Sequence, residues 1–276
     1  MSIAEGSVLT HAIRIHPFAG PLGAEVSGLR RESVVPDTVK EALRVALSTH
    51  LVLVFRGQSM SPQALLAFAA LFGEPVTHQF VQAVPPHGQV TEIRKEPDHL
   101  HNFGGAWHFD LSFMACPPSA TVLMAKELPA HGGDTVWSNQ YLAYAMLLAR
   151  CRDGIDSLLA EHTSQLAFGH GAHALSAVHP LAPRHPHSGC RYLYANPVSI
   201  RRVLGVADEA GNTLLRHLYA HAIALEFQYR HRWELGDIVV WDNRATMHKA
   251  MNDYPGERRV MQRVAVTDRR HRIGLP

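Results

Sequence analysis

The chain has 276 residues and carries 26 basic against 24 acidic side chains, so its charge is nearly balanced. It has no basic stripe interleaved with aromatic residues and no apolar run of transmembrane length, which argues against nucleic acid and membranes as partners. Its three cysteines are far apart and its N-terminus does not resemble a signal peptide, so we expect a cytoplasmic protein without a disulfide framework or a cysteine-rich zinc site.

Apolar spacing and capping residues predict the elements of the first part of the chain. Asp37 is expected to cap a helix whose apolar residues recur at helical intervals. The continuous apolar run at 51–55 is typical of a buried strand. Ser61 and Pro62 begin a second helix, because serine is a good cap and proline suits the first helical position. The predicted elements are strands over 13–15, 23–26 and 51–55, and helices over 38–49 and from 62 to about 73.

Short strands dominate from about residue 90 onward, separated by glycine and proline. The predicted strands cover 90–93, 106–113, 120–125, 134–138, 238–241 and 258–267, and helices are predicted near 139–150 and 211–224. Scattered strands that feed one site suggest a jelly-roll double sheet. We therefore predict a mainly β fold with flanking helices (α+β) around a jelly-roll core. Since neither a repeat nor a composition break divides the chain, we expect one domain over 1–276.

Two histidines and one aspartate are the strongest candidates for chemistry. Two imidazoles and a carboxylate fit a mononuclear non-haem iron(II) site with open coordination positions. On the predicted strand, His108 and Asp110 point to one face while Phe109 turns away. His248, just beyond another apolar strand, is the candidate third ligand. A histidine alone is more often a satisfied core residue, and it is the motifs around these three residues that favour a metal site.

Those motifs follow one another along nearly the whole chain. They are GAEVSG from Gly23, WHFD from Trp107, GGDT from Gly132, WDNRATMH from Trp241 and RRVMQR from Arg258. Together they resemble the taurine dioxygenase (TauD/TfdA) family of iron(II)- and 2-oxoglutarate-dependent dioxygenases. The resemblance implies an oxidoreductase that uses Fe²⁺, 2-oxoglutarate and O₂.

The resemblance also assigns roles to individual residues. The implied iron ligands are His108, Asp110 and His248. Thr135 and Arg259 match the residues that bind the distal carboxylate of 2-oxoglutarate, and Arg263 matches an arginine that faces the anionic group of the substrate. Physical chemistry agrees for the arginines, because a guanidinium binds a carboxylate through two parallel donors. The two arginines also share one face of a predicted strand, where their mutual repulsion calls for anions. A pair of solvated arginines on an edge strand is the alternative interpretation.

The substrate positions depart from the pattern of taurine-using members. His78 matches a histidine that helps to bind the sulfonate. However, Val81 stands in place of a tyrosine and Gly104 in place of an asparagine. Ala167, beside Phe168, replaces a serine. A site without these polar groups loses discrimination for taurine. We therefore expect a bulkier anion: an alkyl or aryl sulfonate, a sulfate ester or a carboxylate.

The implied function is hydroxylation of such a small organic anion, with release of succinate and CO₂. Desaturation or cyclisation by the same iron chemistry is the nearest alternative, and a metal- or ligand-binding protein without turnover is the alternative from another class. We expect an active-site lid around 165–190. The histidine-rich segment 169–190 is interpreted as a mobile polar loop, and a second metal site formed by its histidines is the alternative. The resemblance also implies a homo-oligomer, a dimer or a tetramer.

Overall fold

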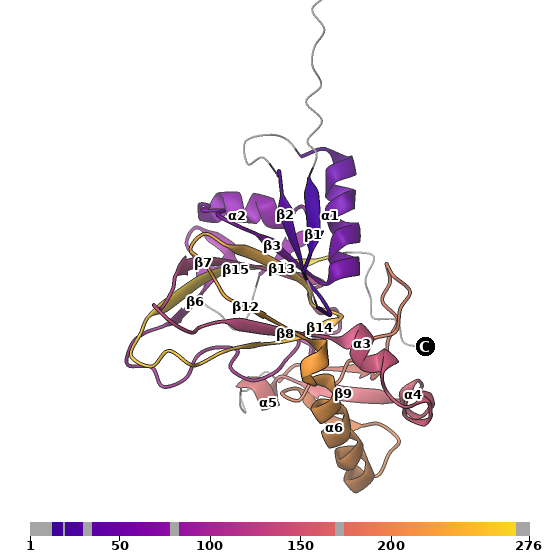
Figure 1. Ribbon diagram of the computed structural model, residues 1–276. Coiled ribbons are helices and arrows are strands. Elements are labelled where there is room, and N and C mark those ends of the chain that lie inside the picture. The colour runs from indigo at the N-terminus through magenta and orange to yellow at the C-terminus, as the bar shows by residue number, and fades with distance from the viewer. Residues whose placement is uncertain (1–12, 19, 30–34, 78–82, 169–173, 269–276) are drawn as a thin grey trace, which may run out of the picture.

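Figure 1 shows the fold in a computed structural model, which describes residues 13–18, 20–29, 35–77, 83–168 and 174–268. A nine-stranded sheet and a three-stranded sheet form the two layers of a jelly roll, which confirms the predicted mainly β fold. The large sheet contains β1 (Arg14–Pro17), β2 (Ala24–Ser27), β3 (Val52–Phe55), β4 (Glu74–Val76), β5 (Ala83–Val84), β6 (His87–Lys95), β7 (Ala120–Glu127), β13 (Ile238–Asp242) and β15 (Arg259–Thr267). The small sheet contains β8 (Thr135–Asn139), β12 (Gln228–His231) and β14 (Thr246–Ala250).

Strand alternation divides the side chains of the large sheet between two cores. Leu53 and Phe55 of β3 belong to the core shared with α1 and α2, whereas Val52 and Val54 belong to the core shared with the small sheet. Both faces of β3 are therefore buried, which explains the continuous apolar run in its sequence. The pocket described below opens between the two layers.

Helices cover the outer face of the large sheet and flank the small one (Figure 1). They are α1 (Asp37–His50), α2 (Pro62–Ala69), α3 (Gln140–Ala145), α4 (Ala149–Ile155), α5 (Gln165–Phe168) and α6 (Asp208–Ala222), with a 3-10 turn, η1 (Leu225–Phe227). Ser61 caps α2 as predicted, since its hydroxyl accepts a hydrogen bond from the N–H of Ala64, but α2 ends before residue 73. The predicted cap of α1 is wrong by one position. Pro36 precedes the helix, and Asp37 is its first residue, where it forms an ion pair with Lys40.

Two further predictions need correction. The strand over 106–113 does not form: only His108 pairs, in an isolated bridge with His248. The chain then turns, because Leu111 has a left-handed φ of +49° that no strand contains. The helix predicted near 139–150 is two short helices, α3 and α4, whereas α6 confirms the helix predicted near 211–224.

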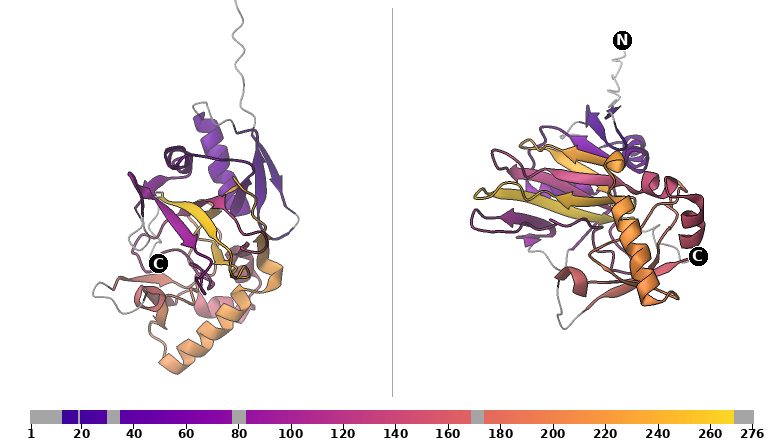
Figure 2. Two further views of the ribbon diagram at one scale, coloured as in Figure 1. Left: turned by 90° about the vertical axis from the view of Figure 1, so that its left-hand side faces the viewer. Right: turned by 60° about the horizontal axis from the view of Figure 1, so that its bottom comes forward.

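A third sheet lies beside α6, away from α1 and α2 (Figure 2). It contains β9 (Leu159–Thr163), β10 (Ser176–Pro180) and β11 (Ile200–Val203). The predicted mobile loop at 169–190 is therefore wrong over β10, because His179 and His185 are buried and find polar partners in Met114 O and Asp242. Residues 169–173, with His170 and His173, lie outside the described residues, and the lid stays a prediction. In the described part of the chain, the helices are too short or too polar to cross a bilayer.

Candidate functional site

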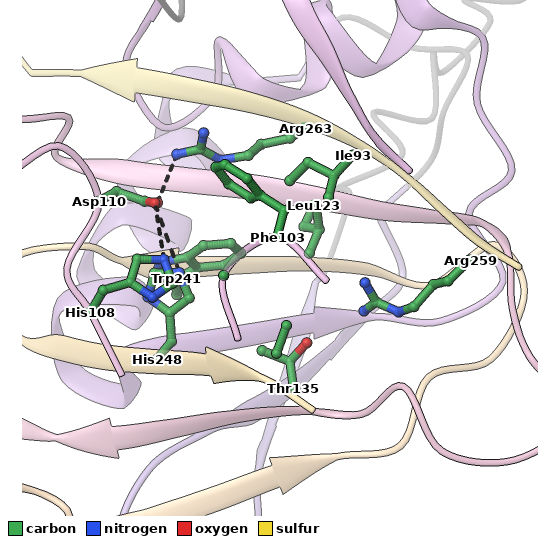
Figure 3. A pocket seen from close by; sticks show the side chains of 12 residues that line it. Ile93, Phe103, His108, Asp110, Leu123, Thr135, Trp241, His248, Arg259 and Arg263 are labelled. Atoms are coloured by element: carbon green, nitrogen blue, oxygen red, sulfur yellow. Dashed lines mark ion pairs between the residues drawn. The ribbon is translucent and has the colours of Figure 1, made fainter. Parts of the chain in front are cut away.

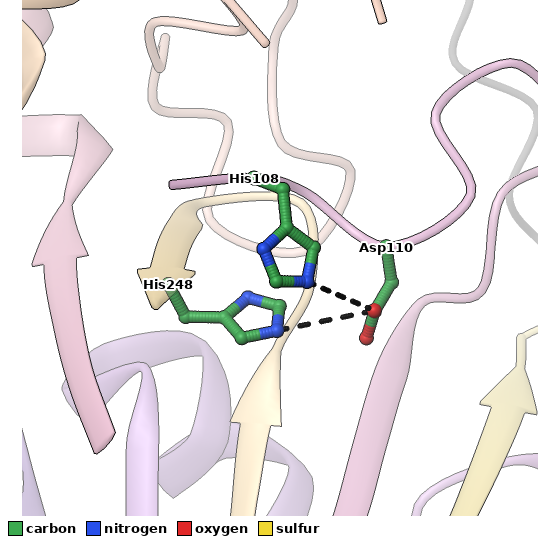
Figure 4. A group of neighbouring side chains, drawn as sticks. All are labelled: His108, Asp110 and His248. Atoms are coloured by element: carbon green, nitrogen blue, oxygen red, sulfur yellow. Dashed lines mark ion pairs between the residues drawn. The ribbon is translucent and has the colours of Figure 1, made fainter. Parts of the chain in front are cut away.

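Two histidines from distant parts of the chain lie directly opposite each other. The backbone N–H of His108 donates to the carbonyl of His248, and the reverse hydrogen bond has the same length, 2.9 Å. Opposed residues of an antiparallel pair place their side chains on one face. The centroids of the two rings are accordingly 4.1 Å apart, and both rings point toward Asp110 (Figure 4). Backbone pairing thus assembles two of the three predicted ligands.

Asp110 completes the group from the turn that follows His108. Its Oδ1 lies 3.8 Å from Nε2 of His108 and 3.9 Å from Nε2 of His248. One ion could contact all three atoms at such separations. Within the described residues, no other group of three histidine, cysteine or acidic side chains is arranged to hold a metal. Two imidazoles and one carboxylate match the facial triad of non-haem iron(II) oxygenases, which leaves coordination positions open.

The second carboxylate oxygen of Asp110, Oδ2, contacts two other side chains. Oδ2 accepts a hydrogen bond from the hydroxyl of Thr121 (2.8 Å) and lies 2.8 Å from Nη2 of Arg263. Burial raises the pKa of Asp110, but Arg263 and the two histidines lower it more, so its pKa lies below the usual range for a carboxyl. The carboxylate is therefore charged, and Oδ1 is the oxygen left for a metal.

Both imidazoles are suited to coordinate through Nε2. Nδ1 of His108 lies 2.8 Å from the carbonyl oxygen of Ala106, so Nδ1 carries the proton and Nε2 keeps a lone pair toward Asp110. Burial is the largest influence on the pKa of His248 and lowers it well below its usual value. His248 is therefore neutral, which is the form of histidine that binds metals.

Asn243 holds the backbone of Asp110, and the sequence interpretation gave it no role. Its Oδ1 accepts a hydrogen bond from the N–H of Asp110 (3.0 Å), and its Nδ2 donates to the carbonyls of Asp110 (3.1 Å) and Pro118 (3.0 Å). All these groups are buried, so they depend on one another for hydrogen bonds. Membership of the motif that ends in His248 was the only sequence signal for this residue.

The opposite end of the pocket carries a guanidinium that forms no ion pair with any described residue. Arg259 is only 5% exposed, and its Nε and Nη2 have no hydrogen-bond partner within the described structure. Its side chain points into the same pocket as that of Thr135 (Figure 3). Burial lowers the pKa of Arg259, which reflects the cost of a cation away from water. A carboxylate placed here would offset that cost, so the site fits the distal end of a keto diacid such as 2-oxoglutarate.

Arg263 lines the same pocket from the same face of β15, as the sequence predicted, and lies beside the triad (Figure 3). Its contact with Asp110 is short but lies off the direction of its N–H bonds, so Nη1 and Nη2 still lack hydrogen-bond acceptors in the described residues. The pocket is lined by Ile93, Phe103, Gly104, His108, Asp110, Leu123, Thr135, Trp241, His248, Ala250, Arg259 and Arg263. Apart from the triad, Thr135 and the two arginines, these linings are apolar.

Within its described residues, the structure places only one of the remaining predicted substrate residues in the pocket. Gly104 lines the pocket, and a Cβ at this position would lie 3.3 Å from Cε1 of His108. Phe168 is not among the described residues that line the pocket; its ring packs against Phe113, 5.9 Å away between centroids. His78 and Val81 lie outside the described residues.

The sequence model described as "Taurine catabolism dioxygenase TauD, TfdA family" matches residues 14–265 of this chain. The chain belongs to the TauD/TfdA family. This dioxygenase is an oxidoreductase whose cofactor is Fe²⁺ and whose cosubstrates are 2-oxoglutarate and O₂. The ligand triad fits the iron, and Arg259, whose Nε and Nη2 find no hydrogen-bond acceptor among the described residues, fits the cosubstrate.

Similar proteins extend over almost the full length of this TauD/TfdA member. An alpha-ketoglutarate-dependent sulfate ester dioxygenase of Pseudomonas putida is 34% identical over 96% of this chain and 94% of its own. An alkylsulfatase of Acinetobacter baylyi is 29% identical over 93% of this chain and 86% of its own. The crystal structure of a putative alpha-ketoglutarate-dependent taurine dioxygenase from Burkholderia xenovorans superimposes with a TM-score of 0.84, with 31% identity and 93% coverage of both chains.

Proposed function

We propose that this dioxygenase hydroxylates a small organic anion that carries an apolar group, with a primary alkyl sulfate ester as the leading candidate. The observation that carries this proposal is Arg263, a buried cation with donors to spare beside Asp110. The wall nearby consists of Ile93, Phe103 and Leu123. A sulfate group would pair with the cation while a hydrocarbon group contacts the wall. Sulfonates and carboxylates have the same two parts and belong to the same substrate class.

The residue roles follow from the geometry of the pocket. His108, Asp110 and His248 would hold the iron, and Thr135 with Arg259 would bind the distal carboxylate of 2-oxoglutarate. When bound, iron and 2-oxoglutarate reduce O₂, release succinate and CO₂, and replace a substrate C–H by C–OH. The protein's own residues orient the reactants and keep water out. Arg263 would fix the anionic end, and thereby decide which carbon faces the metal.

A primary alkyl sulfate ester has a direct chemical outcome in this scheme. Hydroxylation of the carbon next to the ester oxygen gives a hemiacetal-like product. Loss of the hydroxyl proton and departure of sulfate then break the C–O bond and form an aldehyde. Free sulfate, aldehyde, succinate and CO₂ should therefore appear in equal amounts.

Taurine is a poor fit to this pocket. Gly104 offers no side chain to hydrogen-bond an ammonium group, and the neighbouring wall is apolar. An ammonium group placed there would lose its hydration without gaining acceptors.

A panel of substrates tests the proposal. The protein is mixed with Fe²⁺, 2-oxoglutarate and O₂, and succinate is measured with hexyl sulfate, benzyl sulfate, hexanesulfonate, hexanoate and taurine. We expect the hexyl or benzyl compounds to stimulate succinate release and taurine to leave it near background. Stimulation by taurine alone would overturn the proposed substrate class. Asp110→Ala is the control, and it should release no succinate with any compound.

The alternatives differ in their products. Desaturation or cyclisation would consume 2-oxoglutarate and O₂ in the same way, but mass spectrometry would find a product without added oxygen. A binding protein without turnover would form the visible charge-transfer band of anaerobic Fe²⁺ with 2-oxoglutarate but release no succinate. We infer turnover because the triad and both ends of the pocket are intact.

We also infer that the chain acts as one domain, with a lid around 165–190, in the cytoplasm, as a homodimer or homotetramer. The free state of Cys116, Cys151 and Cys190 supports a reducing compartment. Sedimentation of the purified protein tests the oligomeric state, and limited proteolysis with and without 2-oxoglutarate and substrate tests the lid.

A further inference from the structure

An indole packs against the two residues that are assigned to the cosubstrate's distal carboxylate, Thr135 and Arg259. Trp233, which follows β12, is 7% exposed. Its Nε1–H donates a hydrogen bond to the hydroxyl of Thr135 at 3.0 Å. Its ring also lies next to the guanidinium of Arg259, with Cζ 5.9 Å from the ring centroid. Trp233 thus contacts both residues assigned to the distal carboxylate.

We propose that Trp233 is a positioning residue that sets the selectivity of the site for a dicarboxylic keto acid. A threonine hydroxyl has one proton to donate. Because the oxygen of Thr135 already accepts the indole N–H, its own proton is directed away from Trp233, and no described residue accepts it. A carboxylate in the pocket would be that acceptor. The inference rests on the proposed roles of Thr135 and Arg259.

The same indole restrains Arg259. A guanidinium within about 6 Å of a tryptophan ring is attracted to the ring face. Arg259 has no described anionic partner, so this contact and its packing are what keep the side chain oriented before a ligand arrives. A preoriented guanidinium loses less freedom when it pairs with a carboxylate, and binding is correspondingly tighter.

A buried polar chain holds the indole in turn. The ring of His231 meets that of Trp233 edge to face, 4.8 Å between centroids. Nε2 of His231 lies 3.1 Å from Oδ2 of Asp237, which also pairs with Arg56 and accepts the N–H of Glu234 (2.9 Å). Support of this kind fixes the orientation of a residue that orients a ligand.

A keto acid without the distal carboxylate separates this role from simple packing. 2-Oxopentanoate has the same five-carbon chain as 2-oxoglutarate and the same chelating end, but it ends in a methyl group. If Trp233 positions Thr135 and Arg259, its replacement weakens the binding of 2-oxoglutarate, whose distal carboxylate uses these residues, and leaves the binding of 2-oxopentanoate unchanged. If Trp233 merely supports the fold, its replacement lowers the affinity for both acids by the same factor.

The experiment titrates the anaerobic Fe²⁺ protein with each acid and follows the visible charge-transfer band. Trp233→Phe removes the N–H and keeps an aromatic face. Trp137→Phe is the matched control, because the N–H of Trp137 is also buried but has no hydrogen-bond partner in the described structure. We expect Trp233→Phe to weaken 2-oxoglutarate binding about tenfold, as loss of a buried hydrogen bond to a charged-ligand site does. The affinity for 2-oxopentanoate should stay the same, and Trp137→Phe should keep the wild-type ratio of the two affinities.

Other outcomes would overturn the proposal. If Trp233→Phe keeps the wild-type ratio of the affinities for 2-oxoglutarate and 2-oxopentanoate, Trp233 has a structural role only. This holds whether both affinities fall or neither does. If Trp233→Phe does not fold by circular dichroism, Trp233→Tyr removes the same N–H while filling more of the space, and the same ratio decides. Absence of 2-oxoglutarate binding to the wild-type protein would overturn the proposed function itself, which distinguishes that failure from the failure of Trp233.

Discussion

His108 and His248 exchange both of their backbone hydrogen bonds at 2.9 Å, although no strand continues through His108. The spacing between the two imidazoles is therefore set by an antiparallel pair, a rigid element of backbone geometry. Asp110 enters from a turn instead, and depends on Asn243, Thr121 and Arg263 for its position. The backbone therefore fixes the two histidines relative to each other, whereas contacts with other side chains fix the position of the aspartate.

Replacement of a histidine ligand should abolish metal binding without unfolding the protein. His248→Ala removes one of three ligands and keeps the backbone pair with His108. Mutation of a residue that only hydrogen-bonds a metal ligand typically lowers metal affinity by roughly 10–100-fold. Loss of the ligand itself should lower the affinity for Fe²⁺ or Mn²⁺ by more than that. Isothermal titration with Mn²⁺ measures it. His217→Ala, an exposed position on α6, is the control and should bind as the wild type does. Tight binding by His248→Ala would remove this residue from the metal site.

Asn243→Ala should weaken the metal site although Asn243 is not a ligand. It leaves the buried N–H and carbonyl of Asp110 without partners, so the turn should shift and metal affinity should fall about 10–100-fold. Asn252→Ala is the matched control, because that amide donates to a carbonyl at an exposed site. A loss of thermal stability at unchanged Mn²⁺ affinity would contradict the positioning role.

Arg259→Met should have opposite effects on binding and stability. It removes a buried cation that has no anionic partner in the described part of the chain. The protein without cosubstrate should therefore unfold at a temperature higher by a few degrees, which corresponds to about 1 kcal/mol. 2-Oxoglutarate affinity should fall at least about a hundredfold. Arg258→Met, at the half-buried neighbouring position that already pairs with Glu96 and Glu127, is the control and should change neither the stability nor the 2-oxoglutarate affinity strongly. Lower stability of Arg259→Met in the absence of 2-oxoglutarate would contradict the argument.

Gly104→Ala should damage the metal site as well as the backbone. Gly104 has a φ of +74°, so any other residue is strained by about 1–2 kcal/mol. The new Cβ would also press on Cε1 of His108. Gly205→Ala provides the control, since Gly205 has a φ of +73° and open space around it. Both variants should lose similar stability by urea unfolding, and only Gly104→Ala should lose Mn²⁺ affinity.

Acid should destabilise the protein partly through Asp242. Burial raises the pKa of Asp242, but Arg244 and His185 lower it more, and the net pKa lies well below the ordinary 3.8. A carboxyl with a lowered folded-state pKa contributes stability above its unfolded value and loses that contribution as the pH falls below it. Asp242→Asn should therefore be less stable than the wild type at pH 6, with a smaller difference at pH 3. Urea unfolding at both values measures this, and a difference that is independent of pH would contradict the assignment.

Local patterns accounted for the parts of the fold that depend on neighbouring residues. The apolar run at 51–55 is a strand buried on both faces, and Ser61 caps its helix. The strand expected at 106–113 fails because His108 and Asp110 approach each other through a turn, and a spacing of two positions fits a turn as well as a strand. The histidines at 179 and 185 suggested a mobile polar loop, but burial with partners from other segments reversed that prediction.

By itself, the sequence determined the chemistry of the ligands, their order in motifs and the mainly β architecture, because these depend on residue types and on short periodic patterns. Only the tertiary structure decided which side chains support them. The pairing of β12 with β8 places His231 opposite Thr135, and this register brings Trp233 to the hydroxyl of Thr135. Asn243 reaches Asp110 in the same way, across a long interval of chain. Such contacts arise from strand register and packing between distant segments, which no local pattern encodes.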